Sequence, residues 1–113
     1  MPGSTNSIYS GTQTITATVS LTHPPGGAHA TATFQWFITA ITGTWDIALY
    51  ATIGGTDVKV AELTGRTTTG AANIPIVSPF TGTNAAIPAP NKIIFTEAVA
   101  GTLTSQVWAT YGD

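Results

Sequence analysis

The sequence predicts an all-β protein: an antiparallel β-sandwich of about seven or eight strands, jelly-roll-like or immunoglobulin-like, with no significant helix. Three observations lead to this prediction. Apolar and polar residues alternate with a period of two along several segments. Turns rich in glycine and proline separate these segments at intervals of about ten residues, a spacing typical of sandwiches. No apolar pattern with a helical period persists for about ten residues.

The length and composition predict one domain with a packed core. A chain of 113 residues is near the commonest domain size and buries roughly two-thirds of its unfolded surface. Hydrophobic residues make up 42% of the chain and cysteine is absent, so its stability must come from packing and not from disulfides. We expect residues 12–113 to form the sandwich and residues 1–11 to form an N-terminal arm.

The expected arm is small and polar apart from Ile8 and Tyr9. A segment of this kind is ordered only where something receives it. We therefore expect that residues 1–11 can be deleted without loss of the fold.

The first expected strands lie on either side of a proline-glycine loop. Residues 13–21 alternate throughout, which places Ile15 on the core face and threonines on the other face. The Pro-Pro-Gly-Gly stretch within residues 23–27 cannot continue a strand. Residues 30–41 alternate again, with Trp36 on the apolar face.

A tight hairpin is the strongest local prediction. Residues 45–53 and 57–63 both alternate, and Gly54 and Gly55 separate them. Two glycines between alternating runs are typical of a type I′ or II′ turn. A short strand at residues 71–77 is expected to lie at a sheet edge or a strand end, because its proline lacks a backbone donor.

The last two expected strands are residues 92–99 and 102–111. Ala100 and Gly101 are expected to join them as a second close hairpin. Trp108 points away from the apolar face of its strand, so we expect it near a surface or an interface.

The charge content favours association with other proteins. Charged residues are only 7% of the chain, whereas an average soluble domain has roughly a quarter. An uncharged surface loses little solvation free energy on contact with a protein. The only cations, Lys59, Arg66 and Lys92, are too few for a basic patch, so no nucleic-acid partner is expected. No apolar stretch has the length of a membrane span and no secretion signal is evident, so no membrane partner is expected either.

The residue pattern predicts no enzyme, no cofactor and no metal site. The acidic residues are few and none forms an evident acid–base pair, and a GxSxG motif is absent. His23 and His29 flank one loop and could approach a single metal ion, but a zinc site needs at least a third protein ligand. We expect both histidines to be ordinary loop residues.

Apolar side chains in irregular segments are the candidates for protein contacts. Residues 78–90 form a proline-rich stretch that is long for a loop inside a compact domain, and long ordered loops tend to be functional. Trp36 and Trp45 lie on alternating apolar faces and are expected to be core anchors, although the three tryptophans could instead form a sugar-stacking platform. The candidate interaction residues are Ile8, Tyr9, Phe80, Ile87 and Trp108.

Two sequence runs resemble a known class of protein. The run ITAITGTWDIALYATIGGTDVKVAELTGRTTTG, followed by PAPNKIIFTEAVAGTLTSQVWATYGD, is similar to the small β-sandwich proteins encoded in the structural-gene blocks of tailed bacteriophages. The resemblance covers roughly residues 32–111 and consists of strand, glycine-hairpin and threonine-rich patterns.

This resemblance implies a virion component, and specifically a capsid decoration (cement) protein. Such a protein is made in the host cytoplasm, sits on the capsid surface and binds the major capsid protein and copies of itself, as a trimer or dimer. Another virion part, such as a tail, neck or fibre protein, is an alternative, because the pattern is not diagnostic of decoration. A carbohydrate-binding β-sandwich module, resting on the tryptophans, is the alternative from another class.

Overall fold

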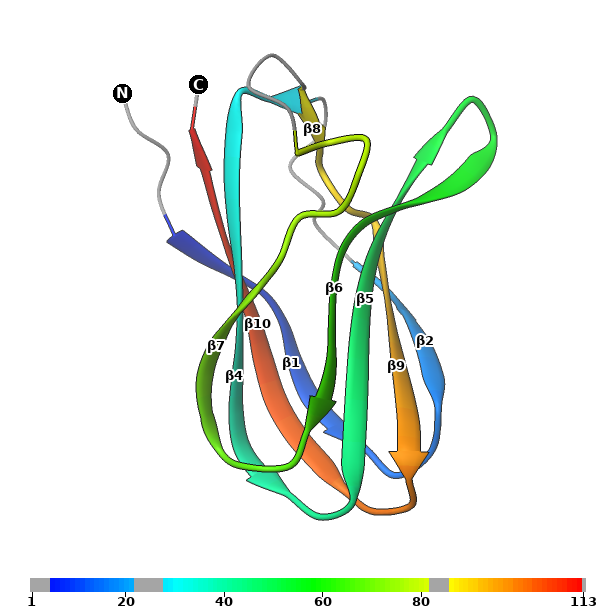
Figure 1. Ribbon diagram of the computed structural model, residues 1–113, viewed down its shortest axis with the longest axis vertical. Helices are drawn as coiled ribbons and strands as arrows, with labels where there is room; N and C mark the ends of the chain where they lie inside the picture. Colours follow the sequence, from blue (N-terminus) through cyan, green and yellow to red (C-terminus); the bar gives the residue numbers. More distant parts are fainter. Residues whose placement is uncertain (1–4, 22–27, 82–85, 113) are drawn as a thin grey trace.

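The computed structural model describes residues 5–21, 28–81 and 86–112, and it confirms the all-β sandwich (Figure 1). Two antiparallel four-stranded sheets pack face to face, with a two-stranded pair at one end. Sheet A has the order β1-β10-β4-β7 and sheet B the order β2-β9-β5-β6. The strands are β1 (Thr5–Gln13), β2 (Ala17–Ser20), β3 (Ala28–His29), β4 (Thr31–Ile41), β5 (Thr44–Ile53), β6 (Thr56–Arg66), β7 (Gly70–Ile74), β8 (Ile87–Pro88), β9 (Lys92–Val99) and β10 (Leu103–Gly112).

The strand order is that of a jelly roll. When the two-residue strands β3 and β8 are set aside, the first strand pairs with the last, the second with the second-to-last, and so on inward: β1 with β10, β2 with β9, β4 with β7 and β5 with β6. The chain is therefore one long hairpin rolled into two sheets, with the β5–β6 turn at its tip. The four short connections between the sheets, at residues 14–16, 42–43, 67–69 and 100–102, lie at the end opposite that tip, whereas β3 and β8 belong to the two longer connections and lie at the same end as the tip (Figure 1).

The core lies between the two sheets and is built by period-two alternation. On β4, Phe34, Trp36 and Ile38 are buried, while the residues between them are exposed. Trp45 on β5 is also completely buried, so the prediction that Trp36 and Trp45 anchor the core is confirmed. Phe95 on β9 contacts Trp36 across the sandwich, with ring centroids 6.2 Å apart.

Two glycine turns pack backbone against backbone at the end opposite the β5–β6 turn. Gly43, between β4 and β5, has a φ of 77°, and a Cβ there would overlap the carbonyl oxygens of Val99 and Ala100. A Cβ at Gly101 would overlap the carbonyl oxygen of Thr42. The Thr42 amide donates to the Thr102 carbonyl at 2.8 Å. These contacts require glycine in both turns.

The expected close hairpin at Ala100-Gly101 is wrong. Strand β9 belongs to sheet B and β10 to sheet A, so the turn crosses between the sheets and the two strands do not pair. A glycine turn can join two paired strands of one sheet or two strands of different sheets. Here Gly101 packs against the backbone of Thr42, and the turn leads from sheet B to sheet A.

The expected continuous strand at residues 13–21 is also wrong. Gln13 ends β1 in sheet A, residues 14–16 form a bend, and β2 begins at Ala17 in sheet B. Ile15 lies in this bend and is 64% exposed instead of facing the core. The change of sheet interrupts an alternation that looks continuous in the sequence.

Residues 5–11 are part of the sandwich and do not form a separate arm. They belong to β1, which pairs with β10 along its length and has a bulge between Ser7 and Tyr9. Tyr9 packs on Phe95 with ring centroids 5.2 Å apart. Deleting residues 1–11 would therefore remove most of a paired edge strand, while residues 1–4 lie outside the described residues. The polar composition that suggested an arm is that of an edge strand with a solvated face.

Strand β7 ends at Ile74, before Pro75, and lies at the edge of sheet A, as the proline in the expected strand 71–77 predicts. The described residues include no helix with the length and apolar character needed to cross a bilayer.

Candidate functional site

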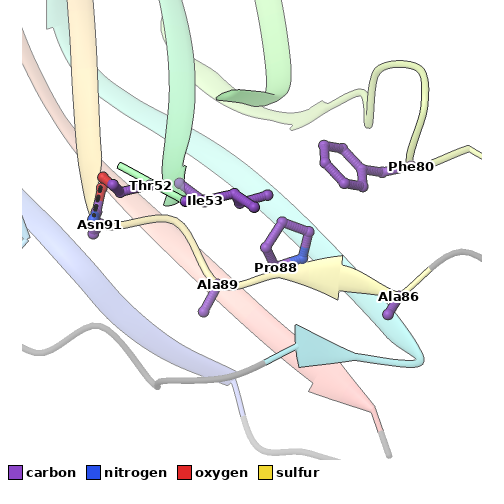
Figure 2. Close-up of a pocket in the computed structure, with 9 residues that line it drawn as sticks. Thr52, Ile53, Phe80, Ala86, Pro88, Ala89 and Asn91 are labelled. Carbon is purple, nitrogen blue, oxygen red and sulfur yellow. Dashed lines mark hydrogen bonds between the residues drawn. The ribbon is translucent and has the colours of Figure 1, made fainter. Parts of the chain in front are cut away.

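An open pocket of about 590 Å³ lies beside the β5–β6 turn, where the end of β5 meets the segment leading into β9 (Figure 2). Its lining is mostly apolar. The ring of Phe80 faces Ile53 and Pro88 across the space. The lining residues are Ala51, Thr52, Ile53, Gly54, Phe80, Ala86, Pro88, Ala89 and Asn91.

The hairpin turn forms one wall of the pocket. Gly54 and Gly55 have φ values of 59° and 83°, which confirms the expected tight hairpin with both central residues in the left-handed region. Ile53 pairs with Thr56 directly before this turn and is 46% exposed. The turn thus carries Ile53 beyond the packed core and holds it beside the pocket.

The opposite wall is fixed by the backbone of Asn91. Its backbone N–H donates to the Tyr50 carbonyl at 2.8 Å, and its backbone carbonyl accepts from the Leu21 N–H at 2.9 Å. Pro90, directly before it, is fully buried. The segment from Pro88 to Asn91 is therefore held on both sides, which keeps this wall in place without a ligand.

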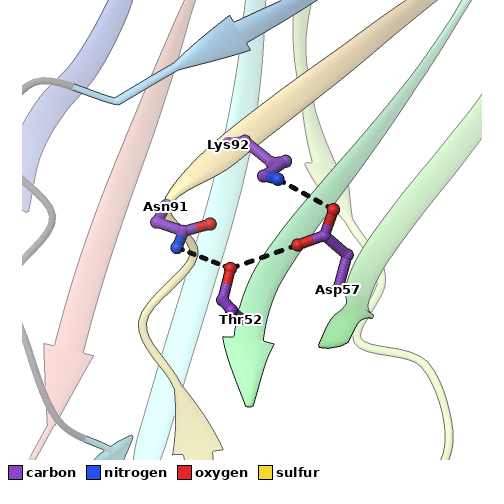
Figure 3. A network of polar contacts seen from close by, with 4 residues as sticks. All are labelled: Thr52, Asp57, Asn91 and Lys92. Carbon is purple, nitrogen blue, oxygen red and sulfur yellow. Dashed lines mark hydrogen bonds and ion pairs between the residues drawn. The ribbon is translucent and has the colours of Figure 1, made fainter. Parts of the chain in front are cut away.

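A polar network closes one side of the pocket (Figure 3). The side-chain Nδ2 of Asn91 donates to the Thr52 hydroxyl at 3.0 Å, and that hydroxyl donates to the Asp57 carboxylate at 3.1 Å. Lys92 forms an ion pair with the same carboxylate at 2.8 Å. Hydrogen bonds from Lys92, and then from Thr52, hold the pKa of Asp57 below its ordinary value. The network joins β5, β6 and β9 at the pocket and keeps the hairpin in position.

The pocket is equipped to bind apolar groups. Its two polar side chains, Thr52 and Asn91, are bonded to each other through the Asn91 Nδ2, which leaves the buried Oδ1 of Asn91 as an acceptor without a partner among the described residues. No described lining residue is titratable. Among the described residues, no group of three His, Cys, Asp or Glu side chains could hold a metal ion. His23, one of the two histidines considered for a metal, lies outside the described residues.

The five candidate interaction residues do not form one site. Phe80 lines the pocket. Ile87 is only 7% exposed and belongs to the core, because β8 holds it against β3. Ile8 and Tyr9 are half-buried and pack against the core from β1. Trp108 is half-buried on the outer face of sheet A.

Ile53 lines the pocket but is not among the interaction residues predicted from the sequence. Its alternation with the core residues of β5 suggested burial, but its position directly before the Gly-Gly turn was a signal that it lies beyond the core. Ala86, Ala89 and Asn91 carried no comparable signal, since they join the site only through contacts distant in sequence.

A buried aromatic cluster lies near the two-stranded pair. Tyr111 is 8% exposed and stacks on His29, with ring centroids 4.3 Å apart. Its hydroxyl is buried without a partner among the described residues. Burial raises the pKa of Tyr111 from 10.0 to about 12.

Stability is expected to fall with rising pH between the two pKa values of this tyrosine. Above pH 10.0 the unfolded chain loses the phenolic proton while the folded chain keeps it, so the free energy of unfolding decreases until the folded pKa is passed. Tyr111→Phe should remove this part of the alkaline loss and be nearly neutral at about pH 7, because the hydroxyl has no partner. Urea unfolding of both proteins across the alkaline range measures the effect. Parallel stability curves for the two proteins would contradict it.

Comparisons with known proteins found no matching family model, no matching curated protein and no matching solved structure.

Proposed function

We propose that this protein is a structural component of a virion, a capsid decoration (cement) protein that stabilises a phage shell by protein–protein contact. Its partners are the major capsid protein and copies of itself, as a trimer or dimer. It acts on the capsid surface after synthesis in the host cytoplasm. Binding to the assembled shell stabilises that shell by mass action, without any bond being made or broken.

The observation that carries this proposal is the apolar pocket beside the β5–β6 turn. Ile53, Phe80 and Pro88 line a preformed concavity whose walls are held by the hairpin and by the Asn91 backbone. A concavity of this kind receives an apolar or aromatic side chain from a partner, as the centre of a protein interface does. Four of its lining residues, Phe80, Ala86, Pro88 and Ala89, belong to the proline-rich stretch of residues 78–90, where apolar side chains are candidates for protein contacts.

Two further features support the same proposal. Charged residues are only 7% of the chain, which lowers the cost of covering its surface with another protein. The jelly roll is used by viral capsid domains and also by lectins. This likeness is an analogy of fold, and the functional argument rests on the pocket.

We expect Ile53→Asp to weaken binding to the shell at least about tenfold, because a carboxylate in an apolar contact loses solvation without a partner. The probe is a shell assembled from the major capsid protein of the genome that encodes this chain. Co-sedimentation of the purified protein with these shells measures the affinity.

The matched control is Ile15→Asp, which places the same charge on an exposed isoleucine at the opposite end of the sandwich. It should bind as the unmodified protein does. Equal loss in both variants would contradict the role of the pocket. Failure of the unmodified protein to bind any virion part would overturn the proposal, and binding to tails or fibres instead of shells would overturn the capsid assignment.

A further inference from the structure

Charge is divided unequally between the two sheets. The four strands of sheet A contain no Asp, Glu, Lys, Arg or His. The charged residues within the described ranges all lie in three strands of sheet B, and they are Asp46, Asp57, Lys59, Glu62, Arg66, Lys92 and Glu97. One broad face of the sandwich is therefore polar but uncharged.

The strand register arranges the outer face of sheet A in rows. Trp108 on β10 lies opposite Gln35 on β4, which lies opposite Asn73 on β7. In the next row Gln106 lies opposite Phe37. Directly paired residues of antiparallel strands share a face. We call these five residues, Trp108, Gln35, Asn73, Gln106 and Phe37, the amide–aromatic platform.

The two aromatic residues of the platform are neighbours in the strand register, and the indole of Trp108 is held in orientation. Trp108 and Phe37 are diagonal neighbours across β10 and β4, a separation of about 7–8 Å in antiparallel sheets. The indole Nε1 of Trp108 donates to the Gln106 side chain at 3.0 Å. Phe37 is 40% exposed. A ligand would therefore meet aromatic surface that is already ordered.

The amides of the platform keep hydrogen-bonding capacity for a ligand. Gln35 donates through Nε2 to Asn73 Oδ1 at 3.2 Å. The Oε1 of Gln35, the Nδ2 of Asn73 and the Nε2 of Gln106 have no protein partner in the described part of the chain. Amides both donate and accept, so the platform offers uncharged donors and acceptors beside aromatic rings.

This combination matches the chemistry of a neutral sugar. The C–H face of a sugar ring packs on an aromatic face, while its hydroxyl groups both donate and accept hydrogen bonds. The absence of cations on sheet A removes the attraction that a sulfated or carboxylated glycan would need. The surroundings are mostly threonine and serine hydroxyls, such as Thr33, Thr110 and Ser10, whereas the centre of a protein interface is more apolar.

We propose that the amide–aromatic platform binds a neutral glycan chain, with a sugar ring stacked on Trp108 and its hydroxyls bonded to Gln35, Asn73 and Gln106. The site is separate from the pocket, whose lining comes from β5 and the segments containing Phe80 and Asn91. Glycan binding and shell binding can therefore fail independently.

Affinity electrophoresis in gels containing dextran, mannan, galactan, xylan or soluble chitin oligomers tests this proposal, with alginate as an acidic comparison. We expect at least one neutral glycan, but not alginate, to retard the protein. Trp108→Ala and Gln35→Ala should each weaken that binding at least tenfold. The matched control is Tyr50→Ala, which removes an aromatic side chain from sheet B and should leave binding unchanged.

Tryptophan fluorescence supplies a second readout. Trp36 and Trp45 are completely buried, so a bound sugar should change the emission of Trp108 alone, and Trp108→Phe should abolish that change. The proposal is overturned if none of the five neutral glycans binds, if only alginate binds, or if Tyr50→Ala weakens binding as much as Trp108→Ala. It is also overturned if Trp108→Ala and Gln35→Ala leave glycan binding intact but dissociate an oligomer in light scattering, since the face would then be a protein interface.

Discussion

Gly43→Ala is expected to destabilise the fold by more than about 3 kcal/mol. Two effects add at this position. The φ of 77° is unfavourable for any residue with a Cβ. The new methyl group would also overlap the backbone carbonyl oxygens of Val99 and Ala100, and a backbone neighbour can move only if the β9–β10 crossing moves with it. Urea unfolding measures the loss.

Gly54→Ala separates these two effects. Gly54 has a φ of 59°, but no atom beyond its two chain neighbours lies within 4 Å of the position that a methyl group would take there, so only the conformational cost of about 1–2 kcal/mol remains. The prediction for Gly43 is wrong if the two variants lose equal stability. A Gly43→Ala chain that fails to fold while Gly54→Ala folds normally agrees with it.

Trp36→Ala is expected to cost roughly 3–5 kcal/mol, the usual range for removing a large aromatic side chain from a core. Trp36 is completely buried at the centre of β4 and contacts Phe95 of the facing sheet. Neighbouring side chains in two strand-built layers cannot collapse far into the space it leaves. Chemical denaturation measures this loss.

Phenylalanine substitutions test what the two buried indole N–H groups contribute. The Nε1 of Trp45 donates to the Thr42 carbonyl at 3.0 Å, whereas the Nε1 of Trp36 has no partner among the described residues. Trp45→Phe should therefore cost about 1 kcal/mol more than Trp36→Phe, the usual net value of one hydrogen bond. A larger loss in Trp36→Phe would show that packing and not hydrogen bonding separates the two sites.

The fold class followed from local patterns, because alternation and turn chemistry are properties of neighbouring residues. Gly54 and Gly55 form the expected hairpin, and Trp36 and Trp45 occupy the expected core. The errors at Ile15 and Gly101 share one cause. A chain that leaves one sheet for the other keeps its alternation and its turn residues, so only contacts with distant backbone distinguish a crossing from a continuous strand or a hairpin.

The candidate sites were less predictable because they combine residues from distant segments. Phe80 could be selected as an apolar residue in a loop, but its neighbours Ile53 and Pro88 are brought to it by the roll of the two sheets. The outward position of Trp108 was evident from its strand alone, whereas its row with Gln35 and Asn73 required the order of β10, β4 and β7.

The nested pairing of the strands also gives the chain an order of closure during folding. The β5–β6 pair closes a two-residue turn, while β4–β7, β2–β9 and β1–β10 close successively longer loops, up to the pairing of Thr5 with Thr110. Closing a longer loop costs more entropy, and contacts distant in sequence slow folding. The jelly roll is thus expected to form outward from the Gly54-Gly55 turn, so the hairpin that shapes the pocket is also the natural starting point of the fold.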